Sequence, residues 1–230
     1  QKVPGPTELG SWVASWKKGF DPHFGGKLGA PKFMTPVMYQ FLMNWGEASG
    51  DPEVREHVQT TLRGMAFGGV FDQIGGGFSR YAVDPRWHVP HFEKMLYDNA
   101  QLLSLYSEGY ALYGEDLYRE VVVQTLEFLD RELSRPEGGY YASLDADSLN
   151  PKGVLEEGAF YTWDGAELAN LLREDFEWFQ EYYNINDFGL WEKGQYVLIR
   201  TVPDETFASK RGWTLETLRE HRARVCKRLL

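Results

Sequence analysis

The sequence contains one cysteine, Cys226, and lacks the features of a secreted or membrane protein. A single cysteine cannot form a disulfide within the chain, and no cysteine cluster offers a metal or redox site. No run of about 18 apolar residues occurs, so the sequence contains no candidate membrane span. The first residues, QKVPGPTELG, lack a starting methionine and the pattern of a signal peptide. We therefore expect a cytoplasmic chain that is processed or cut from a longer one.

Basic residues are also in short supply. The chain has 24 Lys and Arg against 34 Asp and Glu, which gives a formal net charge of −10. Nucleic acids and anionic membranes require a basic surface, so neither is an expected partner. Hydrophobic residues make up 43% of the chain and aromatic residues 15%, which is enough for a folded core and argues against disorder.

Glycines beside aromatic residues recur along the chain at intervals of roughly 50 to 60 residues, a pitch that fits two helices and their loops. The segments between them have helical periodicity, and Thr35 and Asp51, each followed by proline, are predicted N-caps. The four glycine–aromatic segments are GGKLGAPKF, GGGFSRY, GGYYASLDAD and GLWEKGQYVL, which begin at Gly25, Gly75, Gly138 and Gly189. The expected helices cover residues 7–18, 35–48, 51–67, 90–113, 115–133, 164–173, 175–183 and 214–230, with a short β-prone piece at 195–200.

This pattern predicts an all-α fold of successive helical hairpins whose glycine–aromatic loops gather on one side. Such hairpins form either a solenoid or an α/α toroid. The expected helix over residues 90–113 is apolar almost all round, as a helix of an inner ring would be. The expected helix over residues 115–133 is more amphipathic and suits an outer ring. We therefore expect residues 1–230 to form one incomplete toroid domain of about four hairpins.

The sequence resembles the thioredoxin-domain-containing, N-acylglucosamine 2-epimerase-like family of spermatogenesis-associated thioredoxin-like proteins and their bacterial relatives. The resemblance rests on GGVFDQIGGGFSRYAVDP followed by WHVPHFEKMLYDNAQL, and on FDPHFGGKLGAPKF, GGYYASLDADS, EEGAFYTW and GLWEKGQYVL in the same order. It implies an α/α toroid related to six-hairpin glycosidases and sugar 2-epimerases. It covers only the toroid portion, and we expect the thioredoxin-like domain and the C-terminal hairpins to be absent.

Two histidines, His88 and His91, flank Pro90 at the predicted start of a helix. The partial positive charge there favours a neutral imidazole, which is the form that a general base requires. Epimerisation beside a sugar carbonyl needs such a base and an acid on the opposite face. The predicted catalytic residues are therefore His91, His88, Glu93 and Asp98. The alternative for the histidines is a structural one, as hydrogen-bonded core or loop residues.

Carboxylates and aromatic residues crowd the same loops. Asp145 and Asp147, near Glu156 and Glu157, would support glycoside hydrolysis, would bind sugar hydroxyls or would shape the loop. Arg80 is expected to orient a ligand, and sugar rings stack on aromatic faces. The predicted substrate-binding residues are Arg80, Tyr81, Trp87, Asp145, Asp147 and Tyr141.

The combined expectation is a carbohydrate-active toroid protein, epimerase- or isomerase-like, that uses histidine acid–base chemistry. We expect no organic cofactor and no metal. The alternatives are a glycoside hydrolase with paired carboxylates and a non-catalytic module that binds a ligand or a partner. If the ring is cut short, exposed apolar faces should also favour a homo-oligomer.

Overall fold

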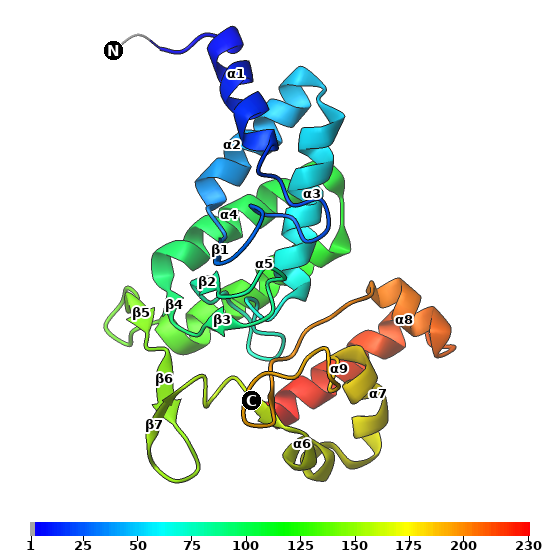
Figure 1. Cartoon of the computed structure of the whole chain (residues 1–230). Coiled ribbons are helices and arrows are strands. Elements are labelled where there is room, and N and C mark those ends of the chain that lie inside the picture. The colour runs from blue at the N-terminus through cyan, green and yellow to red at the C-terminus, as the bar shows by residue number, and fades with distance from the viewer. Residues whose placement is uncertain (1–2) are drawn as a thin grey trace.

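The computed structural model describes residues 3–230, and helices dominate it. In Figure 1 helices α1 to α5 form one group, and α6 to α9 form a second group beside it. The helices are α1 Pro6–Lys17, α2 Pro36–Ser49, α3 Pro52–Phe67, α4 Leu96–Tyr113, α5 Asp116–Phe128, α6 Gly165–Leu172, α7 Phe176–Tyr182, α8 Asp204–Lys210 and α9 Leu215–Leu229. A π-helical turn, Leu129–Leu133, continues α5, and a 3₁₀ turn, Arg173–Asp175, precedes α7.

Two helical hairpins follow one another in the first group. Helices α2 and α3 pack together, as do α4 and α5, and α2 also packs against α4. Gly50 and Gly114 end α2 and α4 in the left-handed conformation, with φ of 70° and 69°, which glycine adopts without steric cost. Asp51 caps α3 as predicted, because its side chain accepts from the backbone N–H groups of Glu53 and Val54.

The second group has its own hydrophobic core. One core runs from Val13 to Val121 and belongs to α1–α5 and their loops. The other runs from Leu168 to Val225 and belongs to α6–α9. A small apolar cluster of Phe92, Ala146 and Val197 lies apart from both cores and joins segments distant in sequence. The helix α8 within the second group had no counterpart among the expected helices.

Short antiparallel strands lie in the connections between the helices, and β9 falls within the β-prone piece predicted at residues 195–200. The strands are β1 Lys32–Phe33, β2 Tyr81–Ala82, β3 Pro90–His91, β4 Lys94–Met95, β5 Ser143–Leu144, β6 Asp147–Leu149, β7 Leu155–Glu157, β8 Trp163–Asp164 and β9 Gln195–Tyr196. The pairings are β1–β2–β3, β4–β5, β6–β7 and β8–β9. Residues near Gly25, Gly75 and Gly138 thereby meet through β1–β2 and β4–β5, and His88 Nε2 lies 3.2 Å from the Gly189 carbonyl. The segments that begin at Gly25 and Gly75 thus pair with each other, whereas those that begin at Gly138 and Gly189 contact β4 and His88.

The expected helix over residues 90–113 is wrong in its first turn. Pro90 and His91 pair with β2, and Lys94 and Met95 pair with β5, so α4 begins only at Leu96. Proline donates no N–H and fits the edge of a short sheet. The helix-terminus argument for neutral histidines therefore does not apply.

The expectation that this helix is buried on several sides is also wrong for α4. Its buried residues, among them Leu102, Leu105 and Tyr106, occupy one face, whereas Leu112 on another face is 49% exposed. A third correction concerns Thr35, which precedes α2 with φ of 38° and makes no capping hydrogen bond. Pro36 alone marks that helix start.

Two loops of the first group have the same arrangement: the carboxylate of an aspartate accepts hydrogen bonds within the turn and also binds a buried lysine. Oδ1 of Asp21 and of Asp72 accepts from the backbone N–H groups two and three residues later, at 2.9 to 3.0 Å. Oδ2 of Asp21 binds the ammonium of Lys32 at 2.6 Å, and Oδ2 of Asp72 binds that of Lys94 at 2.8 Å. Both lysines are only 1% exposed. A buried charge of this kind requires its partner.

The hairpin of β6 and β7 projects from the body of the molecule (Figure 1), and it carries exposed apolar side chains. Leu149 and Leu155 lie directly opposite each other in the hairpin and are 68% and 64% exposed, while Val154 and Phe160 are also more than half exposed. Exposed apolar patches invite association.

We therefore predict that the chain forms a dimer or larger oligomer in light scattering. The double variant in which lysine replaces both Leu149 and Leu155 should be a monomer, because burying charged side chains in an interface is unfavourable. Val37→Lys is a suitable control, since Val37 is exposed to 63% but lies on α2. A monodisperse monomer of the unmodified chain at high concentration would contradict the prediction.

Candidate functional site

The most complete group of reactive side chains surrounds His91 at the end of β3. His91 Nδ1 lies 2.7 Å from Glu157 Oε1 of β7, and the imidazole stacks on the ring of Tyr81 with centroids 5.2 Å apart. Antiparallel pairing places Tyr81 opposite His91, so the sheet itself fixes the stacked position. We refer to Arg80, Tyr81, His91, Glu93, Asp98 and Glu157 together as the His91 cluster.

The contact with Glu157 decides which nitrogen of His91 can transfer a proton. A carboxylate can only accept, so Nδ1 carries the hydrogen and donates it to Oε1. Nε2 then keeps its lone pair. The nearest acidic group to Nε2 is Glu93, whose Oε2 lies 3.8 Å away, beyond hydrogen-bond range. The side chain of His91 is 28% exposed, so a bound molecule could reach this nitrogen.

Arg80 and Glu93 form the second part of the cluster. Arg80 Nη1 donates to Glu93 Oε2 at 2.9 Å, and both side chains remain partly exposed. The pKa of nearby Asp98 is raised from 3.8 to about 6, mainly by burial; the positive charge of Arg80 opposes this shift, and the negative charge of Glu93 contributes to it. Asp98 Oδ2 is buried without a hydrogen-bond partner among residues 3–230. The cluster thus combines an oriented imidazole with a carboxyl group that holds its proton at unusually high pH.

The raised pKa of Asp98 predicts a specific pH dependence of stability. The folded state binds the proton more tightly than the unfolded state, so this contribution is present at about pH 4 and is lost as the pH rises to about 6. Asp98→Asn should remove this part of the slope and should be at least as stable as the unmodified chain at pH 7. Urea denaturation from pH 4 to pH 7 measures it, with the exposed Asp187→Asn as control. If the free energy of unfolding changes equally with pH in the unmodified chain and in Asp98→Asn, the raised pKa of Asp98 is contradicted.

His88, predicted to act beside His91, makes a separate set of contacts. It is 3% exposed, its Nε2 lies 3.2 Å from the Gly189 carbonyl oxygen, and its Nδ1 lies 3.5 Å from Arg86 Nη2. Burial lowers its pKa, so it is neutral. The structural interpretation therefore holds for His88, and its pairing with His91 in one site was wrong.

Other predicted site residues divide between the core and the hairpin. Trp87 is fully buried and donates through Nε1 to the Phe24 carbonyl, so it offers no surface to a ligand. Asp145 Oδ1 accepts from the backbone N–H of Asp147 at 3.0 Å, which is a loop-shaping use. Asp147 itself lies opposite Glu157 in the β6–β7 pair and so borders the His91 cluster.

Tyr141, the last predicted substrate-binding residue, is 51% exposed and has the guanidinium of Arg135 over its ring at 5.4 Å. Lys94, three residues after His91, donates to Asp72 and to the Gly76 carbonyl.

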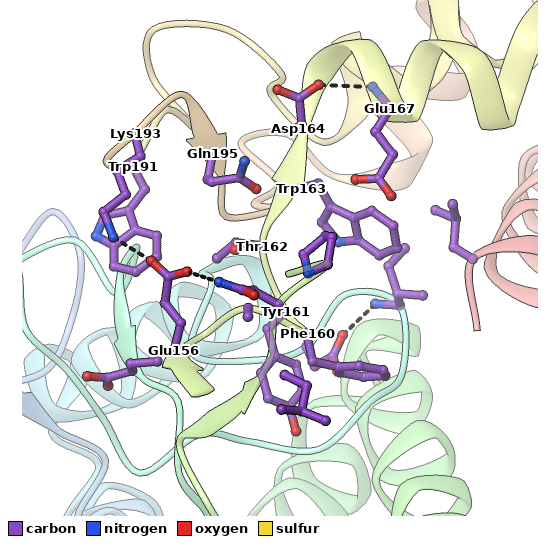
Figure 2. Close-up of a pocket in the computed structure, with 18 of the residues that line it drawn as sticks. Glu156, Phe160, Tyr161, Thr162, Trp163, Asp164, Glu167, Trp191, Lys193 and Gln195 are labelled. Carbon is purple, nitrogen blue, oxygen red and sulfur yellow. Dashed lines mark hydrogen bonds and ion pairs between the residues drawn. The ribbon is translucent and has the colours of Figure 1, made fainter. Parts of the chain in front are cut away.

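A cavity of about 710 Å³ adjoins the cluster and shares Glu157 with it. Figure 2 shows the residues that line the cavity. Phe160, Tyr161 and Trp163 belong to one segment of the chain. Gln195 lies in β9, and Trp191 and Lys193 lie in the loop before it. Lys193 pairs with Glu156, which also accepts from Asn150 at 3.0 Å. Asp164 caps α6 by accepting from the N–H groups of Ala166 and Glu167. Aromatic walls with a few placed polar groups are typical of small-molecule sites.

The aromatic residues of this cavity were recognisable in the sequence, but its polar residues were not. Lys193, Asp164 and Glu167 gave no motif, because β8 and β9 bring them together from distant segments. The sequence groups Glu157 with the other loop carboxylates and does not predict its contact with His91. Within residues 3–230 there is no group of three or more His, Cys, Asp or Glu side chains placed to hold a metal ion. No helix in the same range is long and apolar enough to cross a membrane.

Comparison with known proteins finds relatives in animals. Human spermatogenesis-associated protein 20 is 42% identical over 162 residues, which cover 68% of this chain and 21% of the human protein. The mouse protein of the same name is 40% identical over 162 residues, covering 68% of this chain and 20% of its own length. An uncharacterized protein of Caenorhabditis elegans is 36% identical over 188 residues, covering 75% of this chain and 26% of its own length. The chain thus spans about a fifth to a quarter of these relatives, and no protein-family profile matches it.

Two solved sugar epimerases share the fold over part of this chain. A sugar epimerase from a ruminal bacterium superposes with a TM-score of 0.52 at 18% identity, covering 58% of this chain and 37% of that one. Cellobiose 2-epimerase from Spirochaeta thermophila gives 0.51 at 23% identity, with 58% and 36% covered. These likenesses show the fold. The chain is therefore similar in sequence to spermatogenesis-associated protein 20, and it has the predicted fold of a partial α/α toroid.

Proposed function

We propose that this protein is a carbohydrate epimerase or isomerase in which His91 is the general base and no organic cofactor takes part. The observation that carries the proposal is the contact between His91 Nδ1 and Glu157 Oε1 at 2.7 Å, which leaves Nε2 with a free lone pair at the surface of the cluster. A base so oriented can remove the proton from a carbon next to a sugar carbonyl.

Returning a proton to the opposite face of that carbon requires an acid, and Asp98 is suited to this step. Its pKa of about 6 keeps a fraction of the carboxyl protonated near neutral pH. Arg80, paired with Glu93, is the group in the cluster that can stabilise negative charge on the enolate-like oxygen formed after proton removal.

The adjoining cavity supports a sugar as the substrate. Trp163, Trp191 and Phe160 offer aromatic faces, and Gln195 and the carboxylates beside them can bind hydroxyl groups. The fold of the structural relatives, which include a cellobiose 2-epimerase, agrees with this substrate class. In any longer form of the protein, we propose that a thioredoxin-like domain accompanies the toroid, as the sequence resemblance implies.

The proposal is tested by incubating the chain with cellobiose and with an N-acylglucosamine in D₂O. Proton abstraction should place solvent deuterium on C2 and should produce the C2 epimer, both of which NMR detects. A glycoside hydrolase, favoured if carboxylates such as Glu156 act on the sugar, would instead release new reducing ends without deuterium at C2. Binding of either sugar without exchange or cleavage would identify a non-catalytic module. Either of these two results would overturn the epimerase proposal.

A further inference from the structure

A second cavity, of about 480 Å³, lies between α3 and the segment over residues 188–201, where the two helical groups meet. It shares no lining residue with the His91 cluster. Three arginines line it, Arg63, Arg86 and Arg200, together with His23 and His88, and no carboxylate is among its lining residues. This concentration of cationic side chains is unexpected in a chain of net charge −10.

Arg86 has no carboxylate partner within residues 3–230 and is positioned by neutral groups. Its guanidinium carbon lies 4.7 Å from the ring centroid of Phe188, and its Nη2 lies 3.5 Å from His88 Nδ1. His88 can accept there because its Nε2 carries the hydrogen and donates to the Gly189 carbonyl. His88 is therefore a positioning residue for a guanidinium whose charge is not neutralised.

Arg200 provides the second observation, since it is buried and only partly satisfied. It is 4% exposed, and its Nη1 donates to the Tyr182 hydroxyl and to Asp204, each at 3.1 Å. Its Nε and Nη2 have no hydrogen-bond partner in the described chain. Unsatisfied donors in a buried guanidinium are costly, and a ligand acceptor would reach these two nitrogens only after a local shift, because protein atoms enclose them.

The carboxylates nearest this cavity are already used elsewhere. Glu115 pairs with Arg63 on the side of α5. Asp84 accepts from the backbone N–H groups of Arg86, His88 and Val89. Arg63 and Arg200 are thus paired with Glu115 and Asp204, and within residues 3–230 Arg86 is the cavity arginine whose charge is left for a ligand.

We propose that this cavity binds an organic phosphomonoester. A phosphate dianion offers three acceptor oxygens to guanidinium groups, and the cavity is much larger than a bare oxyanion needs. Phe24, Phe67 and Phe188 line the remaining space and would contact the organic part of the ester. The site does not depend on the proposed epimerase activity.

Calorimetric titration at constant ionic strength tests the proposal, with phenyl phosphate as the probe. Binding should be detected, and Arg86→Gln should weaken it about tenfold or more, because a charge-assisted pair is lost. Phe188→Leu should weaken it less and serves as a second variant. Arg119→Gln is the matched control, since Arg119 is an exposed arginine on α5 that lines a different cavity. Circular dichroism confirms that each variant is folded.

Three results would overturn the proposal. They are the absence of binding to the folded chain, an equal loss in Arg86→Gln and Arg119→Gln, and binding of benzoate or inorganic phosphate as tight as that of phenyl phosphate. If benzoate binds more tightly, the site recognises carboxylates. If inorganic phosphate binds equally tightly, the organic group of the ester does not contribute to binding.

Discussion

His91→Gln should lower deuterium incorporation at C2 by about 10²- to 10⁴-fold, because it removes the general base. The stability of the chain should change by less than about 1 kcal/mol, since the His91 side chain is partly exposed and its contacts lie at the surface. Glu157→Gln should lower kcat by a smaller factor with little effect on KM, because an amide can also donate to Nδ1 and no longer selects one tautomer.

The control for this series is His221→Gln. His221 stacks on Trp213 in the second group of helices, with ring centroids 4.5 Å apart, and has no contact with the His91 cluster. Its exchange rate should match that of the unmodified chain. If His91→Gln unfolds the protein, or exchanges deuterium as fast as His221→Gln, His91 is not the base.

Asp72→Ala should destabilise the chain by about 3–5 kcal/mol, because it leaves the buried ammonium of Lys94 without its counter-charge. The remaining partner of Lys94 is the Gly76 carbonyl, at 2.9 Å. Burial lowers the pKa of Lys94, and the negative charge of Asp72 opposes this shift. Urea denaturation measures the loss.

A double variant separates the lost charge pair from the lost turn. Asp72→Ala combined with Lys94→Met should be more stable than Asp72→Ala alone, since no unpaired charge remains in the core. Lys210→Gln, which breaks the exposed pair with Glu181, should cost less than about 1 kcal/mol. Additive losses in the double variant would show that the turn, rather than the ion pair, is what Asp72 stabilises.

The helices were the part of this fold that the sequence made predictable. Apolar residues three and four apart mark α1, α2, α3, α5 and α9 to within a few residues. Residues 90–95 were wrongly predicted to be helical, because their apolar residues continue the helical spacing of α4. Their true state depends on pairing with β2, whose residues lie 8 to 10 positions earlier, and with β5, whose residues lie 48 to 50 positions later. Pairing across such distances is invisible to local periodicity.

The candidate site was predictable in composition but not in geometry. Arg80 and His91 both lie beside Glu93, and Asp98 is close enough to respond to the charges of Arg80 and Glu93, although the helical spacing that suggested part of this group is absent at residues 90–95. His88 lies outside this group, because strand geometry at Pro90 separates residues that a helix would have kept on neighbouring faces. The loops FDPHFGG and FDQIGGG carried a readable signal that was missed: each repeats an aspartate followed by glycines. The lysine that each aspartate binds lies 11 or 22 residues further on, with no local mark.

The presence of two cores has a consequence for how the chain unfolds. Between α5 and α9 the groups meet through charged pairs, Glu120 with Arg222 and Asp116 with Arg219, and the apolar cluster around Phe92 is small. Salt weakens the exposed Asp116–Arg219 pair much more than it weakens the largely buried Glu120–Arg222 pair or apolar burial. The cooperativity of thermal unfolding should therefore depend on ionic strength: one calorimetric transition at low salt should broaden or divide into two at high salt, as the halves melt independently.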